Sequence, residues 1–522
     1  MTMTMDETQQ LAQQQMEAAA KGMSHSLWAK LRGDKVAVYD PLGQRTFHQI
    51  NEAANKVVRL LRERGLKEGD AVALLCSNRA EFVEVLSGCL RGGYRLTPVN
   101  WHLNADEVEY IINDCDAKAL FAETRYPSGI SAKAPQLTLK VSIGEDAASF
   151  EPYTKLLAEF DGGDITDPSP GSNMLYTSGT TGRPKGVYRR NTGAMMGMVN
   201  IGEPDDVQLC AGPAYHAAPL AFDVRSSMVM GIPLVFIDRW DSEGVLKTIE
   251  KHKVTRAHLV PIMFQRLLNL PDDVRGKYDV SSMRYIIHGA APCPPEVKKA
   301  MIDWVGPIIN EYYAGSEGGA GFVVSSEEWL TKPGTVGKLP DPSALKILDD
   351  DGHDVAQGAS GTLYFKVSPI APFEYYKDPE KTAAAHRDDY FTLGDVGYLD
   401  EDGYLFLTGR TAECIISGGV NIYPQEIDNE LIKHPAVEDA CTIGVPNEEW
   451  GEEVKSVLTL NPGYVGDDAL AKDIQAYARE HLAGFKVPRS IEFVEELPRS
   501  PAGKIQRKKV REPYWAGRAR SI

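Results

Sequence analysis

The chain has 522 residues, of which 43% are hydrophobic and 25% are charged, and its formal net charge at pH 7 is −17. This length exceeds the usual size of one folding unit, so we expect at least two domains. The acidic balance excludes a surface built to hold DNA or RNA, because binding of a nucleic-acid backbone needs a basic field.

The cysteines and the N-terminal residues indicate the compartment. The seven cysteines lie far apart and lack the paired spacing of a zinc site or a disulfide framework. Residues 1–24 are polar and contain no apolar stretch of the kind that a signal peptide requires. No run approaches eighteen apolar residues, so no integral membrane association is expected. We therefore expect a cytoplasmic protein in a reducing compartment.

From about residue 45 onward, short apolar runs alternate with helical periodicity, which predicts an α/β fold with largely parallel sheets. Residues 71–76 are apolar throughout, as in a strand covered on both faces. The apolar residues between 82 and 90 follow helical spacing. A further helix is predicted to begin at Asn104, where Glu107 can complete a capping box. Additional strands are expected at 119–122, 233–237, 257–260, 285–287, 307–309 and 456–460.

The most informative stretch is residues 175–186, where an apolar strand end runs into three glycines, four hydroxyl residues and one lysine. Glycines allow backbone amides to converge on an anion, while hydroxyl groups and an ammonium add donors and charge. Pro184 and Gly186 bracket the lysine, so the spacing differs from that of a Walker loop. The stretch predicts a polyphosphate site formed by Thr177, Ser178, Gly179, Thr180, Thr181, Gly182 and Lys185.

This stretch resembles the signature of the adenylate-forming superfamily, which contains acyl-CoA synthetases, firefly luciferases and the adenylation domains of peptide synthetases. The resemblance extends in order from about residue 45 to about residue 510. It implies a large N-terminal domain of α/β-layered sheets with a β-rich subdomain, followed by a small mobile α+β C-terminal domain. We expect a polar extension at 1–25, the large domain at 26–410 and the small domain at 411–522.

The resemblance assigns two segments to the acyl group and to adenine. His216, with Ala217 beside it, matches the aromatic-histidine segment that borders the acyl pocket. On the sequence alone, a histidine between apolar residues is equally well a packed core residue. The turn beside adenine follows the strand expected at 285–287, and its small residues would let a flat base approach the backbone. It consists of Gly289, Ala290, Ala291 and Pro292.

Residues 311–317 are expected to follow a strand and match the superfamily pattern Tyr-Gly-x-Thr-Glu, with alanine for glycine and serine for threonine. The match implies that Tyr313 stacks near adenine, that Ser316 contacts the α-phosphate and that Glu317 binds magnesium. One carboxylate close to ATP is sufficient for this ion, which prefers carboxylate and phosphate oxygens. The nucleotide site would also include Ala314 and Gly315.

Asp395 and Arg410 match the residues that hold the ribose hydroxyls. Leu393 stands where threonine is common, so we expect a secondary contact to be absent here, while the role of Asp395 is kept. At the hinge about which the small domain turns, Ala412 replaces the usual aspartate or lysine. A hinge needs permissive backbone torsions rather than a particular charge, so we expect rotation to persist.

Two segments of the expected small domain match catalytic elements of the superfamily. Gly418 and Gly419 correspond to the segment that lines the thiol tunnel, where glycines leave room for pantetheine. Lys504 corresponds to the mobile lysine of the terminal catalytic loop. The sequence alone also allows a solvated basic tail here, because further lysines and arginines follow.

The resemblance implies an acyl-CoA synthetase that uses ATP, Mg²⁺ and coenzyme A, with Lys504, Glu317, Thr177 and Lys185 as its catalytic residues. The alternatives are an acyl-AMP ligase that loads a carrier protein, a peptide-synthetase adenylation domain, a luciferase-like monooxygenase and an inactive nucleotide-binding relative. The resemblance leaves a homodimer open.

Small residues cluster around the expected acyl pocket, which includes Gly315 and Gly318. They indicate space for a medium- or long-chain or bulky acid, such as a fatty, steroid side-chain or aryl acid. The cluster comprises Ala217, Ala218, Ala221, Ala314, Gly315, Gly318 and Gly319.

Overall fold

The computed structural model describes residues 5–125, 134–177, 184–189, 202–369, 372–417, 420–448, 450–501 and 503–516. The run expected as a doubly covered strand forms β3 (Ala71–Leu75), and all five of its residues are buried. It lies inside a six-stranded parallel sheet of order β7-β6-β5-β3-β4-β8. The other strands are β4 (Arg95–Pro98), β5 (Ala117–Glu123), β6 (Leu139–Ile143), β7 (Glu151–Pro152) and β8 (Ser172–Asn173).

A second sheet has eight strands in the order β16-β15-β14-β13-β11-β12-β1-β2. Its inner strands are parallel, whereas the outermost strand at each edge pairs antiparallel. The strands are β1 (Val36–Asp40), β2 (Gly43–Thr46), β11 (Gln208–Cys210), β12 (Leu234–Phe236), β13 (Arg256–Leu259), β14 (Tyr285–His288), β15 (Ile309–Gly315) and β16 (Gly318–Val324).

Helices cover these two sheets, as the alternating pattern predicts. The capping box expected at Asn104 is confirmed, because its side chain accepts from the Glu107 backbone N–H and the Glu107 side chain accepts in return. The helices of this part are α1 (Met5–Ala20), α2 (Ser24–Arg32), α3 (Phe47–Glu63), α4 (Ala80–Arg91), α5 (Ala105–Asp114), α6 (Tyr153–Ala158), the π-helix η2 (Pro219–Arg225), α7 (Ser226–Met230), α8 (Ser242–His252), α9 (Pro261–Leu268), α10 (Asp272–Arg275), α11 (Pro295–Val305) and α12 (Ser326–Thr331).

Two smaller antiparallel sheets make up the expected β-rich part. One has the order β20-β10-β9, and the other has the order β17-β23-β22-β19-β18, with β21 beside β22. Helix α13 (Pro379–Ala385) and the 3-10 helix η3 (Pro342–Ala344) accompany them. The strands are β9 (Leu175–Thr177), β10 (Lys185–Arg189), β17 (Gly337–Lys338), β18 (Leu345–Leu348), β19 (Gly361–Lys366), β20 (Phe373–Tyr375), β21 (His386–Arg387), β22 (Tyr390–Leu399) and β23 (Tyr404–Arg410).

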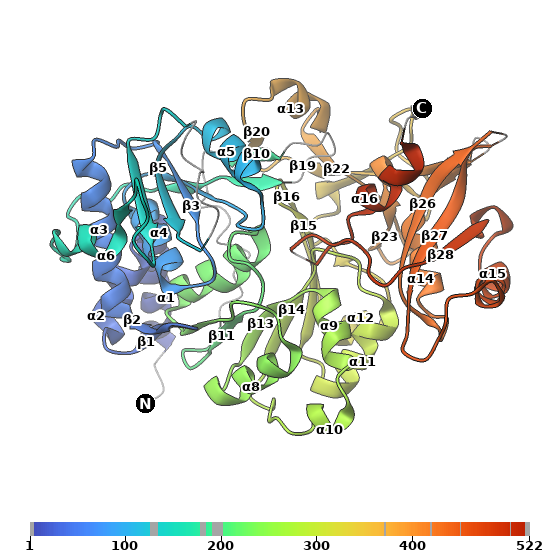
Figure 1. Cartoon of the computed structure of the whole chain (residues 1–522), viewed down its shortest axis with the longest axis horizontal. Helices are drawn as coiled ribbons and strands as arrows, with labels where there is room; N and C mark the ends of the chain where they lie inside the picture. The colour runs from blue at the N-terminus through green and yellow to red at the C-terminus, as the bar shows by residue number, and fades with distance from the viewer. Residues whose placement is uncertain are drawn as a thin grey trace.

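The described residues beyond the 3-10 helix η4 (Thr411–Glu413) form a separate sheet of order β25-β24-β27-β26, with β28 parallel to β27. Figure 1 shows these orange and red elements at one end of the long axis, opposite the blue N-terminal elements. The elements are β24 (Ile415–Ser417), β25 (Val420–Ile422), α14 (Pro424–Leu431), β26 (Val437–Asn447), β27 (Gly451–Leu460), α15 (Asp468–His481), η5 (Gly484–Lys486), β28 (Ser490–Phe493), α16 (Arg507–Arg511) and η6 (Glu512–Trp515).

The α/β fold class expected from the sequence is confirmed, with a mixture of parallel and antiparallel sheets. In the part of the chain that the structure describes, no helix combines the length and apolar character required to cross a membrane.

One strand differs from its predicted position. The sequence predicted a strand at 307–309 with residues 311–317 after it, but β15 begins at Ile309 and extends to Gly315. The expectation was wrong because Tyr312 and Tyr313 pair antiparallel with β16 and continue the strand. Successive residues of a strand face opposite sides, so Tyr312 and Tyr313 belong to different faces of the sheet.

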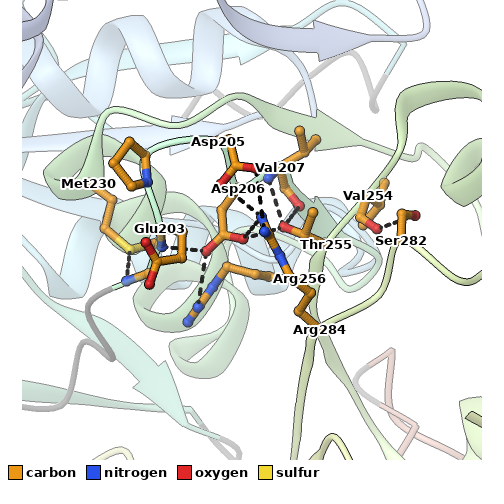
Figure 2. A network of polar contacts seen from close by, with 12 residues as sticks. Glu203, Asp205, Asp206, Val207, Met230, Val254, Thr255, Arg256, Ser282 and Arg284 are labelled. Atoms are coloured by element: carbon orange, nitrogen blue, oxygen red, sulfur yellow. Dashed lines mark hydrogen bonds and ion pairs between the residues drawn. The ribbon is translucent and has the colours of Figure 1, made fainter. Parts of the chain in front are cut away.

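A buried carboxylate anchors the entrance to β11. Asp206, which is 2% exposed, accepts hydrogen bonds from the Glu203 backbone N–H at 2.8 Å, from Thr255 Oγ1 at 2.7 Å and from Arg284 Nη2 at 2.7 Å. Arg256, on β13, lies 3.4 Å from the same carboxylate. Figure 2 shows these groups converging on Asp206 from separate segments. The network thus ties the start of β11 to the neighbouring strand.

Replacement of Asp206 by alanine is expected to lower the free energy of unfolding by about 3 kcal/mol, because it removes the carboxylate partner of a buried arginine. Chemical denaturation monitored by circular dichroism would measure the loss. Asp205→Ala is the matched control, since the side chain of Asp205 is 75% exposed and pairs with Arg284 at the surface. The control should cost less than about 1 kcal/mol. Equal losses in the two variants would contradict this interpretation of the network.

Candidate active site

The predicted phosphate loop is framed by an antiparallel strand pair. Thr177 at the end of β9 stands opposite Lys185 at the start of β10, and Ser178–Gly182 lie outside the described residues. Lys185 Nζ is 2.8 Å from Asp378 Oδ2. This hydrogen bond raises the pKa of Lys185 and lowers the pKa of Asp378. The lysine is therefore fixed as a cation at the mouth of the loop.

Glu317, the predicted magnesium ligand, is held from one side. Tyr375 donates from its hydroxyl to Glu317 Oε1 at 2.9 Å, and burial together with the Glu317 charge raises the pKa of Tyr375. The phenol therefore stays a donor. Arg189 Nη2 donates to the carbonyl oxygen of Ser316 at 3.2 Å. Loss of hydration lowers the pKa of Arg189, and the Glu317 charge opposes this effect.

The predicted ribose-binding pair is formed by two neighbouring strands. Asp395 on β22 stands opposite Arg410 on β23, and Arg410 Nε donates to Asp395 Oδ1 at 2.7 Å. Tyr313 of β15 donates to the other carboxylate oxygen at 2.5 Å. Asp395 is only 5% exposed, so two strong donors hold a short carboxylate in a fixed orientation. Three residues predicted separately are thus brought into direct contact.

The turn predicted beside adenine follows β14 and has a constrained backbone. A Cβ added to Gly289 would lie 2.5 Å from the carbonyl oxygen of Tyr312, so only glycine fits there. Ala290 has φ +66°, the left-handed region that costs an alanine about 1 kcal/mol. Ala291 is half-buried and Pro292 is exposed. The proximity of this turn to adenine remains a prediction.

His216 lies just before η2 and is half-buried, and its Nε2 has no hydrogen-bond partner among the described residues. Burial lowers the pKa of His216 to about 3, with smaller contributions from Lys504 and His102. The imidazole is therefore neutral near pH 7. Ala217, beside His216, is half-buried.

Lys504 is carried by a loop that docks on the large domain. Ser500 N donates to the Lys504 carbonyl oxygen at 2.7 Å and closes the loop. Gly503 has φ +80°, and an added Cβ would lie 2.7 Å from Ile262 Cγ2 at the start of α9. Elsewhere in the same interface, Gln265 Nε2 donates to the Glu438 carbonyl oxygen at 3.0 Å. The loop therefore has both a required glycine and a fixed docking surface.

Lys504 lies within range of the charges of three other candidate site residues. Loss of hydration and the nearby Arg410 lower the pKa of Lys504, whereas Asp395 and Glu317 act in the opposite direction. The Lys504 side chain is exposed to solvent, although many protein atoms lie near it. Groups from β15–β16, β22, β23 and the terminal loop thus converge on one region.

Three glycines that were predicted to lie around the acyl pocket are closely packed against neighbouring residues. An added Cβ would lie 2.8 Å from Leu393 at Gly315 and 3.0 Å from Arg189 at Gly318. At Gly319 it would lie 3.1 Å from Ala314. The space next to these glycines is therefore already filled by other side chains. These positions therefore allow close packing, and their place in an acyl pocket stays a prediction.

The predicted hinge residue, Ala412, lies in η4 between two anchored residues. On one side Arg410 pairs with Asp395, and on the other Arg507 Nε donates to Glu413 Oε2 at 2.9 Å. Arg507 Nη2 also donates to Asp428 Oδ2 at 2.8 Å. Gly418 and Gly419, between β24 and β25, lie outside the described residues.

Four polar residues close to Glu317 and Lys185 were not predicted. Arg189 could have been found, because residues 185, 187 and 189 of one strand share a face. Tyr375, Asp378 and Lys381 lie next to the site only because β20 pairs with β10, a contact between distant segments that local periodicity does not reveal.

A lysine of the C-terminal unit lies within range of the charges of Glu317 and of the Asp395–Arg410 pair on the large α/β part. This arrangement is the one expected of an adenylate-forming enzyme. Residues 26–372 match the AMP-binding enzyme family, and residues 426–504 match the AMP-binding enzyme C-terminal domain. The chain belongs to this family and is an AMP-forming ligase of carboxylic acids.

Three similar proteins illustrate the range of the family. The 2-succinylbenzoate–CoA ligase of Geobacillus kaustophilus is 33% identical, over 93% of this chain and 97% of that ligase. The fatty acid–acyl-carrier-protein ligase ScoC of Streptomyces coeruleorubidus is 30% identical, over 91% of this chain and 93% of ScoC. The crystal structure of the anthranilate CoA ligase AuaEII with anthranoyl-AMP has a TM-score of 0.85 at 26% identity, over 95% of this chain and 97% of AuaEII.

Proposed function

We propose that this protein converts a carboxylic acid and ATP to an acyl-adenylate and pyrophosphate, and then transfers the acyl group to coenzyme A with release of AMP. The observation that supports it most is the docking of the Lys504 loop on α9, which brings Lys504 within range of the charges of Asp395, Arg410 and Glu317. Those three residues match nucleotide-binding positions of the superfamily, and Lys504 comes from a different structural unit. Such convergence of opposite charges suits a polyanionic substrate.

In the first half-reaction, an oxygen of the substrate carboxylate attacks the α-phosphorus of ATP. The bond from that phosphorus to the bridging oxygen breaks, and the electron pair leaves with pyrophosphate. Two anions must approach each other, so positive charge is required before reaction. In our proposal Lys504 supplies it near the α-phosphate, and Lys185 supplies it at the predicted phosphate loop. Asp395 and Arg410 hold the ribose.

The residues around Glu317 fit a magnesium ion. The Tyr375 hydroxyl donates to Glu317 Oε1, and no described residue forms a hydrogen bond or ion pair with Glu317 Oε2. One carboxylate oxygen together with phosphate oxygens is a suitable donor set for this hard cation. Bound there, magnesium would neutralise phosphate charge. We propose Glu317 as its protein ligand.

In the second half-reaction we propose that the C-terminal unit rotates at Ala412. Rotation would withdraw Lys504 and bring the segment with Gly418 and Gly419 over the adenylate, so that the thiol of coenzyme A attacks the acyl carbon. The anchored neighbours of Ala412 support this location, because the torsions between two fixed residues can absorb a rigid-body movement.

Among the acids expected from the sequence, we favour an aryl acid. Phe222 of η2, which follows His216, lies 4.6 Å from the ring of Tyr312 and stacks on His258 at 5.6 Å. A flat ring packs well against such a cluster. The aryl acids named for 2-succinylbenzoate–CoA ligase and AuaEII agree with this choice. Fatty and steroid side-chain acids remain the other candidates.

A carrier protein is the alternative acyl acceptor. The similarity to ScoC, which is named as an acyl-carrier-protein ligase, supports this alternative. It would leave the first half-reaction unchanged. The two acceptors differ in whether free coenzyme A accelerates turnover.

Pyrophosphate release across short, medium, long, aromatic and steroid acids, with and without coenzyme A, tests the proposal. We expect release with an aryl acid, and thioester and AMP formation when coenzyme A is added. Release without thioester formation would favour a carrier protein. No release with any acid would refute adenylate formation by this chain. Light scattering of the same preparation would test for a homodimer.

A further inference from the structure

Helix α13 holds a lysine beside the candidate phosphate-binding residues. Asp378 caps this helix by accepting from the Lys381 backbone N–H at 3.0 Å. Thr382 fixes the helix to β20, because its Oγ1 accepts from the Tyr375 backbone N–H at 2.9 Å. The Lys381 side chain therefore starts from a constrained backbone next to Tyr375.

The ring of Tyr375 lies between the Lys381 ammonium and Glu317. Its Nζ is 4.1 Å from the centroid of the Tyr375 ring, and the hydroxyl of that tyrosine donates to Glu317 Oε1. Lys185 approaches the same region from β10 through its contact with Asp378. The Lys185 ammonium thus contacts the residue that caps α13, and the Lys381 ammonium lies over the ring of the tyrosine that donates to Glu317.

The carboxylate that caps α13 is already engaged. One oxygen of Asp378 accepts from the Lys381 backbone, and the other pairs with Lys185. Among the described residues, no carboxylate forms an ion pair with the half-buried Lys381 ammonium, which keeps only the face of Tyr375. An ammonium has three donors, so this arrangement leaves capacity for an anionic ligand.

We propose that Lys381 binds the β- and γ-phosphates of ATP and stabilises pyrophosphate as it leaves. This inference rests on the proposed adenylation. When the carboxylate oxygen bonds to the α-phosphorus and the bond to the bridging oxygen breaks, negative charge increases on the pyrophosphate. A cation at that end lowers the energy of the leaving group without contacting the acyl part.

The competing interpretation is that Lys381 only packs on Tyr375 and supports the fold. In that case its replacement would weaken ATP and AMP equally or leave both unchanged. A ligand of the β- and γ-phosphates instead affects ATP alone, because AMP lacks those groups. Comparison of the two nucleotides therefore separates the roles.

Calorimetric titration of the full chain with ATP and with AMP tests the proposal. For Lys381→Met we expect the Kd for ATP to rise about tenfold, as for loss of one charge-assisted hydrogen bond, with the Kd for AMP unchanged. Lys381→Arg should retain most of the ATP affinity. Lys377→Met is the matched control, because it removes an equal charge from the preceding turn, where Lys377 pairs with Asp116 at 2.8 Å.

An unchanged ATP affinity in Lys381→Met, or an equal loss for ATP and AMP, would overturn the inference. A tenfold loss in Lys377→Met as well would overturn it too, since general electrostatics would then explain the effect. Should the wild-type chain bind ATP but release no pyrophosphate with any acid, the proposed function would fail while the titration still decides whether Lys381 contacts the phosphates.

Discussion

Replacement of Lys504 by alanine is expected to lower the rate of adenylate formation by about 10² to 10³-fold, the usual cost of removing one preorganised group that stabilises developing charge. Acyl transfer to coenzyme A from a supplied acyl-adenylate should continue at nearly the wild-type rate, because Lys504 is withdrawn in the proposed second half-reaction. Pyrophosphate release and thioester formation, measured separately, check the two halves.

The nearby Lys508→Ala variant is a suitable control, because Lys508 is exposed on α16 and has no role in the proposed chemistry. It should retain both half-reactions. If Lys504→Ala lost both halves to the same degree, Lys504 would be acting through the fold of the loop. The proposal that the C-terminal unit serves adenylation in one orientation and acyl transfer in the other would then be wrong.

Replacement of Asp395 by alanine is expected to weaken ATP binding by about 30- to 1000-fold, because it removes a buried, hydrogen-bonded carboxylate and leaves Arg410 without this partner. Titration with ATP and with 2′-deoxy-ATP provides the measurement. The wild-type chain should prefer ATP, since the carboxylate is proposed to accept from the ribose hydroxyls. The variant should bind both nucleotides with similar affinity.

Tyr313→Phe accompanies this experiment, because it removes only the hydroxyl that donates to Asp395. It should keep the preference for ATP while changing overall affinity less. If Asp395→Ala still preferred ATP over 2′-deoxy-ATP, the carboxylate would support the strands and would not bind the ribose hydroxyls.

The sequence by itself determined the local elements whose causes lie close together in the chain. Continuous apolar residues were sufficient to predict β3, and the spacing of Asn104 and Glu107 was sufficient to predict the start of α5. The pattern around Lys185 indicated phosphate chemistry for a similar reason, since glycines, hydroxyls and a lysine adjoin one another. The extent of β15 was missed because its pairing with β16 decides where it ends.

Only the tertiary structure decided which of these residues meet. Asp395 and Tyr313 come from different sheets, and docking of the terminal loop on α9 brings Lys504 within range of the Asp395 charge. Lys381 lies near Glu317 because β20 pairs with β10. Strand order and domain docking depend on burial summed over many distant contacts, so a local pattern can name the chemical groups of a site but cannot bring them together.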